Sequence, residues 1–224
     1  MYIHFSKPMK TIGNLENIKL IDDKGRELRG AIFNNVYELW DQDQTQLTLI
    51  LDPARVKTGL QANRQMGRAL QAGQDYQLLI GRLEDVDGNR SKAVYKKSFH
   101  VSTEDRLSPN TALWSLRIPK AESLSPLLIQ FPQMLDQLSL LQRLQLTDQN
   151  KQPIPGKVEI KKQETLWQFT PSSEWQAGDY VLYVHARLED PCGNNLNGLF
   201  DHKVGSLKNE REGMIERIPL SIGQ

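Results

Sequence analysis

Apolar and polar residues alternate along much of this chain, as they do in strands that bury one face. Residues 47–52 place three leucines on one face, and residues 76–80 and 180–184 each place a tyrosine and two aliphatic residues on one face. Dense turn signals separate these runs: "DDKGRE" (22–27), "DVDGN" (85–89), "TDQNKQPIPG" (147–156) and "DPCGNN" (190–195). Short strands between frequent turns predict an all-β sandwich.

Two segments have helical spacing. Residues 135–146 ("LDQLSLLQRLQL") predict a short helical turn before a strand, and residues 54–70 show a weak helical pattern. Neither is long enough to indicate an α/β protein.

One phrase occurs twice, as "RLEDVDGN" (82–89) and "RLEDPCGN" (187–194), with six of eight residues identical and the second copy starting 105 residues after the first. Earlier blocks repeat in the same order: "IHFSKPM" (3–9) with "IQFPQM" (129–134), "LTLILDP" (47–53) with "LWQFTP" (166–171), and "LQAGQDYQLLIG" (70–81) with "WQAGDYVLYVHA" (175–186). A period this long indicates domain duplication rather than a solenoid. We expect two β-sandwich domains, 1–105 and 106–224. The first carries an inserted arm, 54–70, where the second has only "SSEW" (172–175).

Residues inside the repeat have predicted structural roles. Tyr76 and Tyr180 each begin a strand just after a glycine turn, which is typical of the tyrosine corner of Ig-like sandwiches. Gly88, Asn89, Gly193 and Asn194 are expected to form the turn before the last strand of each domain, because glycine and asparagine tolerate a left-handed backbone.

The order of these motifs resembles the bacterial Ig-like domain of the S-layer type. The first copy (2–101) has "I-x-F-S-x-P-M", "L-T-L-x-x-D-P", "L-x-x-G-x-x-Y-x-L", "D-x-x-G-N" and a closing "F-x-V". The second copy (112–222) matches less fully, since "FPQM" lacks the Ser-x-Pro step. The arm is also similar to one in bacterial proteins with two such modules. The resemblance implies a fold more than an activity.

The repeated acidic phrase also raises two chemical alternatives, a calcium site and a carboxylate pair for glycoside hydrolysis. An EF-hand fails, because counting from Asp85 places glycine at position 4 and Lys96 at position 12. Glycosidase chemistry needs two carboxylates about 5–10 Å apart, which the sequence cannot place. No G-x-S-x-G, H-E-x-x-H or glycine-rich phosphate loop occurs. We therefore predict no catalytic residues, no metal and no cofactor.

The arm is the main candidate binding segment. It contains Arg55, Lys57, Arg64 and Arg68 and no acidic residue, within a chain whose net charge is +1. Long loops on β-sandwiches often bind partners. The alternative is that the arm packs across the sheet through its apolar residues. Trp40 and Trp114 are candidate sugar platforms, although tryptophans at alternating strand positions are more often core residues.

Composition limits the partners. Lys+Arg (28) and Asp+Glu (27) nearly cancel, so no global field favours nucleic acid or an anionic membrane. No apolar run approaches the ~18 residues of a membrane span. The single cysteine, Cys192, cannot form an intrachain disulfide and is expected to lie buried in its turn.

We predict a non-enzymatic tandem Ig-like module of a bacterial envelope or secreted protein, acting as spacer, scaffold or adhesion segment for an unknown protein or glycan. The alternatives are a carbohydrate-binding accessory module and an enzyme with an unfamiliar site.

The second copy has a strand at 112–119 ahead of its first block, and the first copy has no counterpart to it after Met1. We therefore expect a longer precursor, with an export signal upstream and a periplasmic or cell-surface location.

Overall fold

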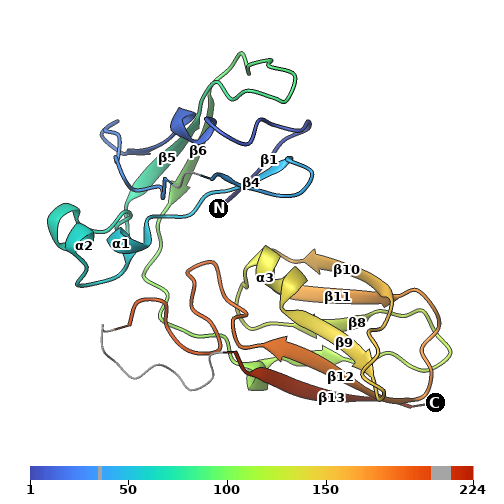
Figure 1. Ribbon diagram of the computed structural model, residues 1–224. Helices are drawn as coiled ribbons and strands as arrows, with labels where there is room; N and C mark the ends of the chain where they lie inside the picture. The colour runs from blue at the N-terminus through green and yellow to red at the C-terminus, as the bar shows by residue number, and fades with distance from the viewer. Residues whose placement is uncertain (35–36, 203–212, 224) are drawn as a thin grey trace. The chain divides into compact units, whose positions relative to one another are not determined.

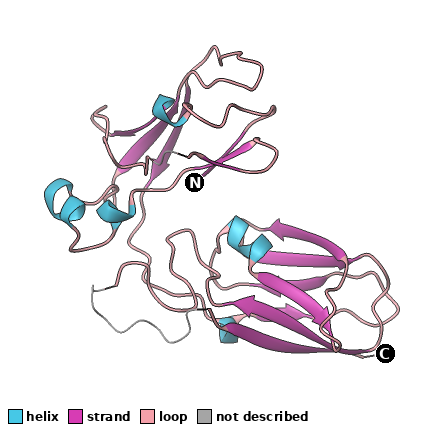
Figure 2. Ribbon diagram, viewed as in Figure 1, coloured by secondary structure: helices cyan, strands magenta, loops and turns pink. Residues whose placement is uncertain are grey.

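The computed structural model describes residues 1–34, 37–202 and 213–223, and its regular structure is almost all β-strand (Figure 1, Figure 2). The prediction of an all-β protein is confirmed. The short helices in the described residues are α1 (Pro53–Val56), α2 (Gln61–Met66) and α3 (Gln137–Gln142), with 3-10 turns η1 (Leu15–Asn17) and η2 (Thr111–Leu113). None of the helices in this part of the chain is long and apolar enough to span a membrane.

The chain divides into two compact units. The first comprises Met1–Glu104 with Asp201–Val204, and the second comprises Asp105–Phe200 with Gly205–Gln224. Each unit contains two antiparallel sheets and has its own apolar core.

The first unit pairs its strands in two three-stranded sheets. One sheet has the order β1 (Tyr2–His4), β4 (Gln46–Thr48), β3 (Leu39–Trp40), and the other β2 (Ile18–Asp22), β5 (Asp75–Ile80), β6 (Tyr95–His100). Leu47 of β4 packs in one cluster with Ile18 of β2 and Leu78 of β5. The apolar faces that alternation predicts therefore meet between the two sheets.

The second unit has a four-stranded and a three-stranded sheet. The first has the order β10 (Gly156–Lys161), β11 (Leu166–Pro171), β8 (Leu127–Gln130), β7 (Ser115–Arg117), and the second β13 (Ile215–Ile222), β12 (Gly178–His185), β9 (Leu144–Asp148). Ile129, Trp167 and Leu182 come from both sheets and are each at most 1% exposed, in one continuous core.

The repeated sequence blocks form matching strand pairs in the two units. Ile3 pairs with Leu47 as Ile129 pairs with Trp167. On the other sheet, β2 pairs β5 and β9 pairs β12, with Asp22 opposite Tyr76 and Asp148 opposite Tyr180. These registers make Ile3 equivalent to Ile129 and Tyr76 equivalent to Tyr180.

One strand distinguishes the units. In the second, β7 pairs with β8 and Leu116 lies opposite Ile129, which is fully buried. In the described part of the first, β1 is the edge strand of its sheet, and Ile3 is only partly buried. The predicted strand at 112–119 is confirmed as the shorter β7.

Capping explains where two short helices begin. The Asp52 carboxylate accepts the Ala54 N–H at 2.8 Å, with Pro53 as the first residue of α1. The Asp136 carboxylate accepts the Ser139 N–H at 2.8 Å at the start of α3. The predicted turn before a strand over 135–146 is thus α3 followed by β9.

Candidate functional site

The repeated phrase forms the same hydrogen-bonded turn in both units. Asp85 Oδ1 accepts the N–H groups of Asp87 (3.0 Å) and Asn89 (2.8 Å). The backbone of the turn closes through the Gly88 N–H to the Asp85 carbonyl (3.1 Å) and the Asp85 N–H to the Asn89 carbonyl (2.9 Å). Gly88 has φ +81°, a conformation that favours glycine.

In the second unit Asp190 Oδ1 likewise accepts the N–H groups of Cys192 (2.8 Å) and Asn194 (3.0 Å). The side-chain amide of Asn194 donates to Asp190 Oδ2 at 2.9 Å, and Gly193 has φ +84°. Gly193 and Asn194, which the sequence predicts to form a turn, therefore lie in one turn with Asp190. The Asp190 carboxylate accepts hydrogen bonds from amide groups of that same turn.

The same geometry recurs in two turns outside the repeated phrase. Asp22 Oδ1 accepts the N–H groups of Lys24 and Arg26, and Asp148 Oδ1 accepts those of Asn150 and Gln152, at 2.8–3.0 Å. In all four turns, the residue three positions after the aspartate has a left-handed backbone conformation, with positive φ. Within the described residues no group of three or more His, Cys, Asp or Glu side chains is arranged to hold a metal ion.

The two tyrosines hydrogen-bond to backbone upstream of their strands. The Tyr76 hydroxyl accepts the Gln71 N–H at 3.0 Å, and the Tyr180 hydroxyl donates to the Gln176 carbonyl at 3.0 Å. Both rings are buried, at 5% and 8% exposed. Each hydroxyl is therefore bonded to backbone upstream of its own strand, as an acceptor in one unit and a donor in the other. The tyrosine corner stays a prediction.

The side chain of Arg55 hydrogen-bonds to several backbone segments of the arm and its surroundings. Its side chain is buried, and its guanidinium donates to the carbonyls of Arg29 (3.1 Å), Met66 (3.3 Å), Gly67 (3.2 Å) and Arg68 (3.2 Å). The planar fork of five donors suits this cluster of carbonyls. Arg55 therefore fastens the chain after α2 to the segment that precedes Ala31.

The charge of Arg68 is balanced by acids from distant parts of the sequence. Its guanidinium lies 2.9 Å from both Glu104 Oε1 and Asp201 Oδ2, and Asp201 also accepts the backbone and hydroxyl donors of Thr58. All of these residues belong to the first unit. Nothing in the arm's own sequence shows that these acids lie beside it.

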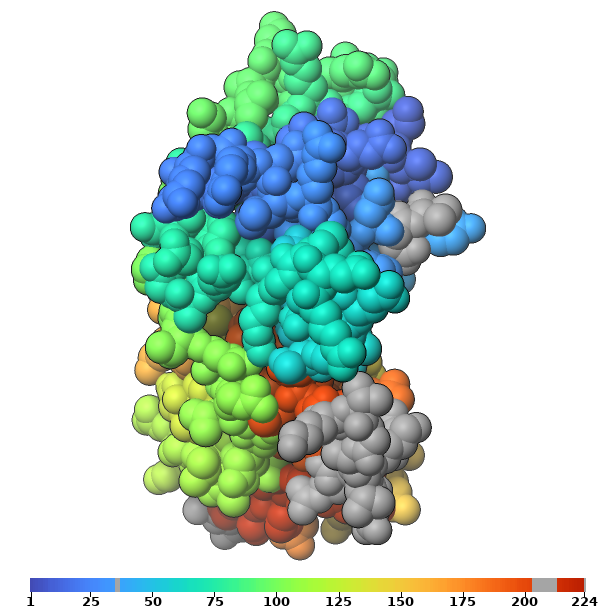
Figure 3. Space-filling model, turned by 90° about the vertical axis from the view of Figure 1, so that its left-hand side faces the viewer, coloured from blue at the N-terminus to red at the C-terminus, as the bar shows by residue number. Residues whose placement is uncertain are grey.

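Lys57 is half-buried and Arg64 is exposed, so the four basic residues do not share one environment. Figure 3 shows the arm as part of the outer surface of the first unit. Two of the four basic residues, Arg55 and Arg68, take part in the arm's own structure, and binding by the arm stays a prediction.

The cysteine and two tryptophans were predicted from the sequence to be buried or packed in a core. Cys192 is exposed, so the prediction of a buried turn thiol is wrong: Asp190 caps its backbone N–H, and its side chain lies on the solvent side of the turn. Trp114 is 8% exposed and packs edge-on against Phe131, whereas Trp40 is partly buried beside Phe5. Both tryptophans are packed against phenylalanines, as expected for core residues.

The second unit also has a groove that the sequence did not reveal. It has a volume of about 320 Å³ and runs along the turn after β9 and the start of β12, beside Trp175 and Tyr180. Its lining includes the acids Asp148, Glu174 and Asp179. The signal available in the sequence was the difference between the copies, since "SSEW" replaces the arm at this place.

Comparisons with known proteins identify no family. No family model matches the chain, and no curated protein matches it. Among solved structures, alpha-2-macroglobulin from Escherichia coli aligns at 10% identity with a TM-score of 0.29, over 99% of this chain and 66% of that one. Two structures of the S-layer protein SbsC align at 9% identity with TM-scores of 0.32 and 0.33, over 100% of this chain and 39% of theirs. Scores this low establish neither a common fold nor a common function.

Proposed function

We propose that the chain is a tandem pair of Ig-like β-sandwich modules in a bacterial envelope or secreted protein, and that it acts without catalysis as a spacer, scaffold or binding segment. The observation that carries the proposal is the duplication: two units, each with its own core, are built from the same blocks in the same register. The motif order that resembles S-layer-type Ig-like domains agrees with this use.

If the chain is a spacer made of two modules, each module should unfold separately when the chain is stretched. Pulling the chain in a force spectrometer should give two unfolding events, each corresponding to roughly 35 nm of extended chain, because about 100 residues extend at roughly 3.5 Å each. A single event that released the whole chain would contradict the modular account.

The proposed location is tested separately. Protease added to intact cells of the producing bacterium, or to cells whose outer layer has been opened, should digest the protein while a cytoplasmic marker survives. Protection of the protein until the cells are lysed would place it in the cytoplasm and contradict the proposal.

One observation favours the carbohydrate-binding alternative. Tyr37 is 72% exposed and lies with Phe33, which is 41% exposed, beside a small hollow in the first unit that Leu39 and Ile50 also line. Exposed aromatic rings can stack on sugar rings. Retention on polysaccharide gels should then be lost in Tyr37→Ala and kept in Tyr95→Ala, whose residue is 64% exposed on β6. Equal retention of both variants would remove the alternative.

A further inference from the structure

Each unit carries a long insertion that the other lacks, in the connection between two of its strands. In the first unit, residues 49–74 connect β4 to β5 and include the arm, whereas residues 172–177 make the equivalent connection between β11 and β12. In the second unit, residues 186–214 connect β12 to β13, and this connection is much longer than the equivalent residues 81–94 between β5 and β6. Duplication alone explains neither insertion.

The two insertions meet at one aspartate. Asp201 stands in the connection between β12 and β13, yet it belongs to the first compact unit. Its Oδ1 accepts the Thr58 N–H at 2.8 Å, and its Oδ2 accepts the Thr58 hydroxyl at 2.7 Å and the Arg68 guanidinium at 2.9 Å. Thr58 and Arg68 are both residues of the arm. Three donors of one insertion therefore converge on a carboxylate of the other, and hydrogen bonds to an ionised acceptor are the strong ones.

Arg68 contacts the chain at both ends of the segment 105–200. Its guanidinium also lies 2.9 Å from Glu104 Oε1, and Glu104 is the last residue before the chain enters the second unit. Asp201 is the first residue after that segment. The side chain of Glu104 is 42% exposed and that of Asp201 is 13% exposed, so Asp201 is the stronger of the two attachments.

The second attachment changes how freely the two units can move. Residues 102–107 are exposed, and two domains joined by one exposed linker reorient by default. Because Asp201 is already joined to the arm through the folded chain, its binding to Thr58 and Arg68 is an intramolecular event, which a high effective concentration favours. Attachment at Glu104 and Asp201 together removes freedom that one linker leaves.

We propose that the arm is an intramolecular docking site for the β12–β13 connection, and that this docking limits the motion of the two units relative to each other. Thr58 and Arg68 form the site, and Asp201 is the side chain that it binds. Arg55 positions the site, because its guanidinium donates to the carbonyls of Gly67 and Arg68. A spacer or scaffold needs stiffness, so this inference rests on the proposed function and assigns the arm a partner within its own chain.

The test is ¹⁵N relaxation of the intact chain, which gives one rotational correlation time for residues 1–104 and another for residues 105–200. In Asp201→Ala, which removes the acceptor of these three bonds, both times should shorten toward half, the limit for two bodies of equal mass that tumble independently. Thr58→Val removes one donor and keeps the shape of the side chain, so a smaller change in the same direction is expected. The matched control, Asp43→Ala, removes an exposed carboxylate between β3 and β4 and should tumble as the wild type does.

Unchanged correlation times in Asp201→Ala and Thr58→Val, or equal shortening in Asp43→Ala, would overturn the proposal. Lower stability of the first unit in urea with unchanged correlation times would give the cluster a purely structural role and would overturn it as well. Failure here is distinguishable from failure of the proposed function. Two events in the pulling experiment with unchanged correlation times would refute only this inference, whereas a single event with the expected shortening would refute only the modular spacer.

Discussion

Asp85 and Asp190 hold the same turn in the two units, yet their surroundings move their pKa values in opposite directions. The amide hydrogen bonds, first that of the Asn89 side chain, lower the pKa of Asp85. Burial raises the pKa of Asp190 and outweighs the equivalent bonds from Asn194 and Cys192. Similar hydrogen bonds to the carboxylate therefore accompany opposite pKa shifts, because Asp190 is more deeply buried than Asp85.

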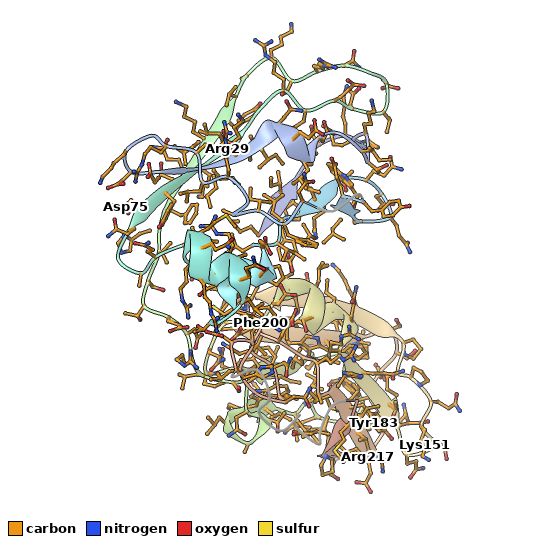
Figure 4. The ribbon with its side chains drawn as sticks, turned by 60° about the vertical axis from the view of Figure 1, so that its left-hand side comes forward. Arg29, Asp75, Lys151, Tyr183, Phe200 and Arg217 are labelled. Carbon is orange, nitrogen blue, oxygen red and sulfur yellow. The ribbon has the colours of Figure 1, made fainter. Side chains whose placement is uncertain are left out.

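The segment that follows the Asp190 turn packs against that turn. The Phe200 N–H donates to Asn194 Oδ1 at 3.0 Å, and the Phe200 ring lies so close to Gly193 that an added Cβ would meet it at 3.0 Å (Figure 4). An added Cβ at Gly88 would meet nothing within 4 Å. The turn in the first unit is open, and the turn in the second is covered.

The two aspartates should titrate on opposite sides of 3.8, the ordinary value for this carboxyl group. The stability that ionised Asp85 contributes is present above 3.8 and is lost as the pH falls through its lowered pKa. The contribution of Asp190 is present below 3.8 and is lost as the pH rises through its raised pKa. Carboxyl ¹³C NMR titration of the intact chain measures both, and a midpoint for Asp190 below that of Asp85 would contradict this account.

Lys151 is a second residue whose local environment can be tested (Figure 4). It stands at φ +63° in the turn after β9, where the equivalent turn of the first unit has Gly25 at φ +77°. A side chain in this conformation costs free energy that glycine avoids. Lys151→Gly should raise the free energy of unfolding of the second unit by about 0.5–1 kcal/mol.

The reverse substitution is the control. Gly25→Lys should destabilise the first unit by about 1 kcal/mol from backbone strain alone, because an added Cβ there meets nothing within 4 Å. Urea denaturation followed through NMR signals assigned to each unit separates the two effects. Destabilisation by Lys151→Gly would show that the lysine side chain has a role beyond the turn.

At the scale of elements, the arm depends on Arg55. In Arg55→Met the four carbonyls that its guanidinium satisfies lose their donors in a buried place. We expect a loss of about 2 kcal/mol or more in the free energy of unfolding of the first unit. Arg64→Met, at an exposed position of α2, should change it by less than about 0.5 kcal/mol. Equal stability of the two variants, measured by urea denaturation, would remove the structural role of Arg55.

The strands were predictable from the sequence because alternation and turn residues are local signals. The runs at 76–80 and 180–184 are parts of β5 and β12, and the repeated phrase is the turn between strands. The contacts of Arg68 with Glu104 and Asp201 were not predictable, since the partners lie 36 and 133 residues away along the chain. Side-chain exposure at Cys192 also escaped prediction, because a capped turn fixes the backbone and leaves the side-chain direction open.

At the scale of the whole molecule, duplication followed by divergence explains the candidate site. Both units keep the turns, the buried tyrosines bonded to upstream backbone and the paired sheets. Only the first has the inserted arm; in the second, Trp175, the counterpart of Leu70, is buried against Tyr180.

The central claim is that two separate cores of equivalent design support the chain, and hydrogen–deuterium exchange of the intact protein tests it most directly. Leu182 is fully buried in the second core, and Leu182→Ala should destabilise that unit by about 2–5 kcal/mol. We predict faster exchange in peptides from 105–200 and 213–223 and unchanged exchange in peptides from 1–104, with the converse for Leu78→Ala in the first core. Equal loss of protection in both units on either substitution would contradict the account.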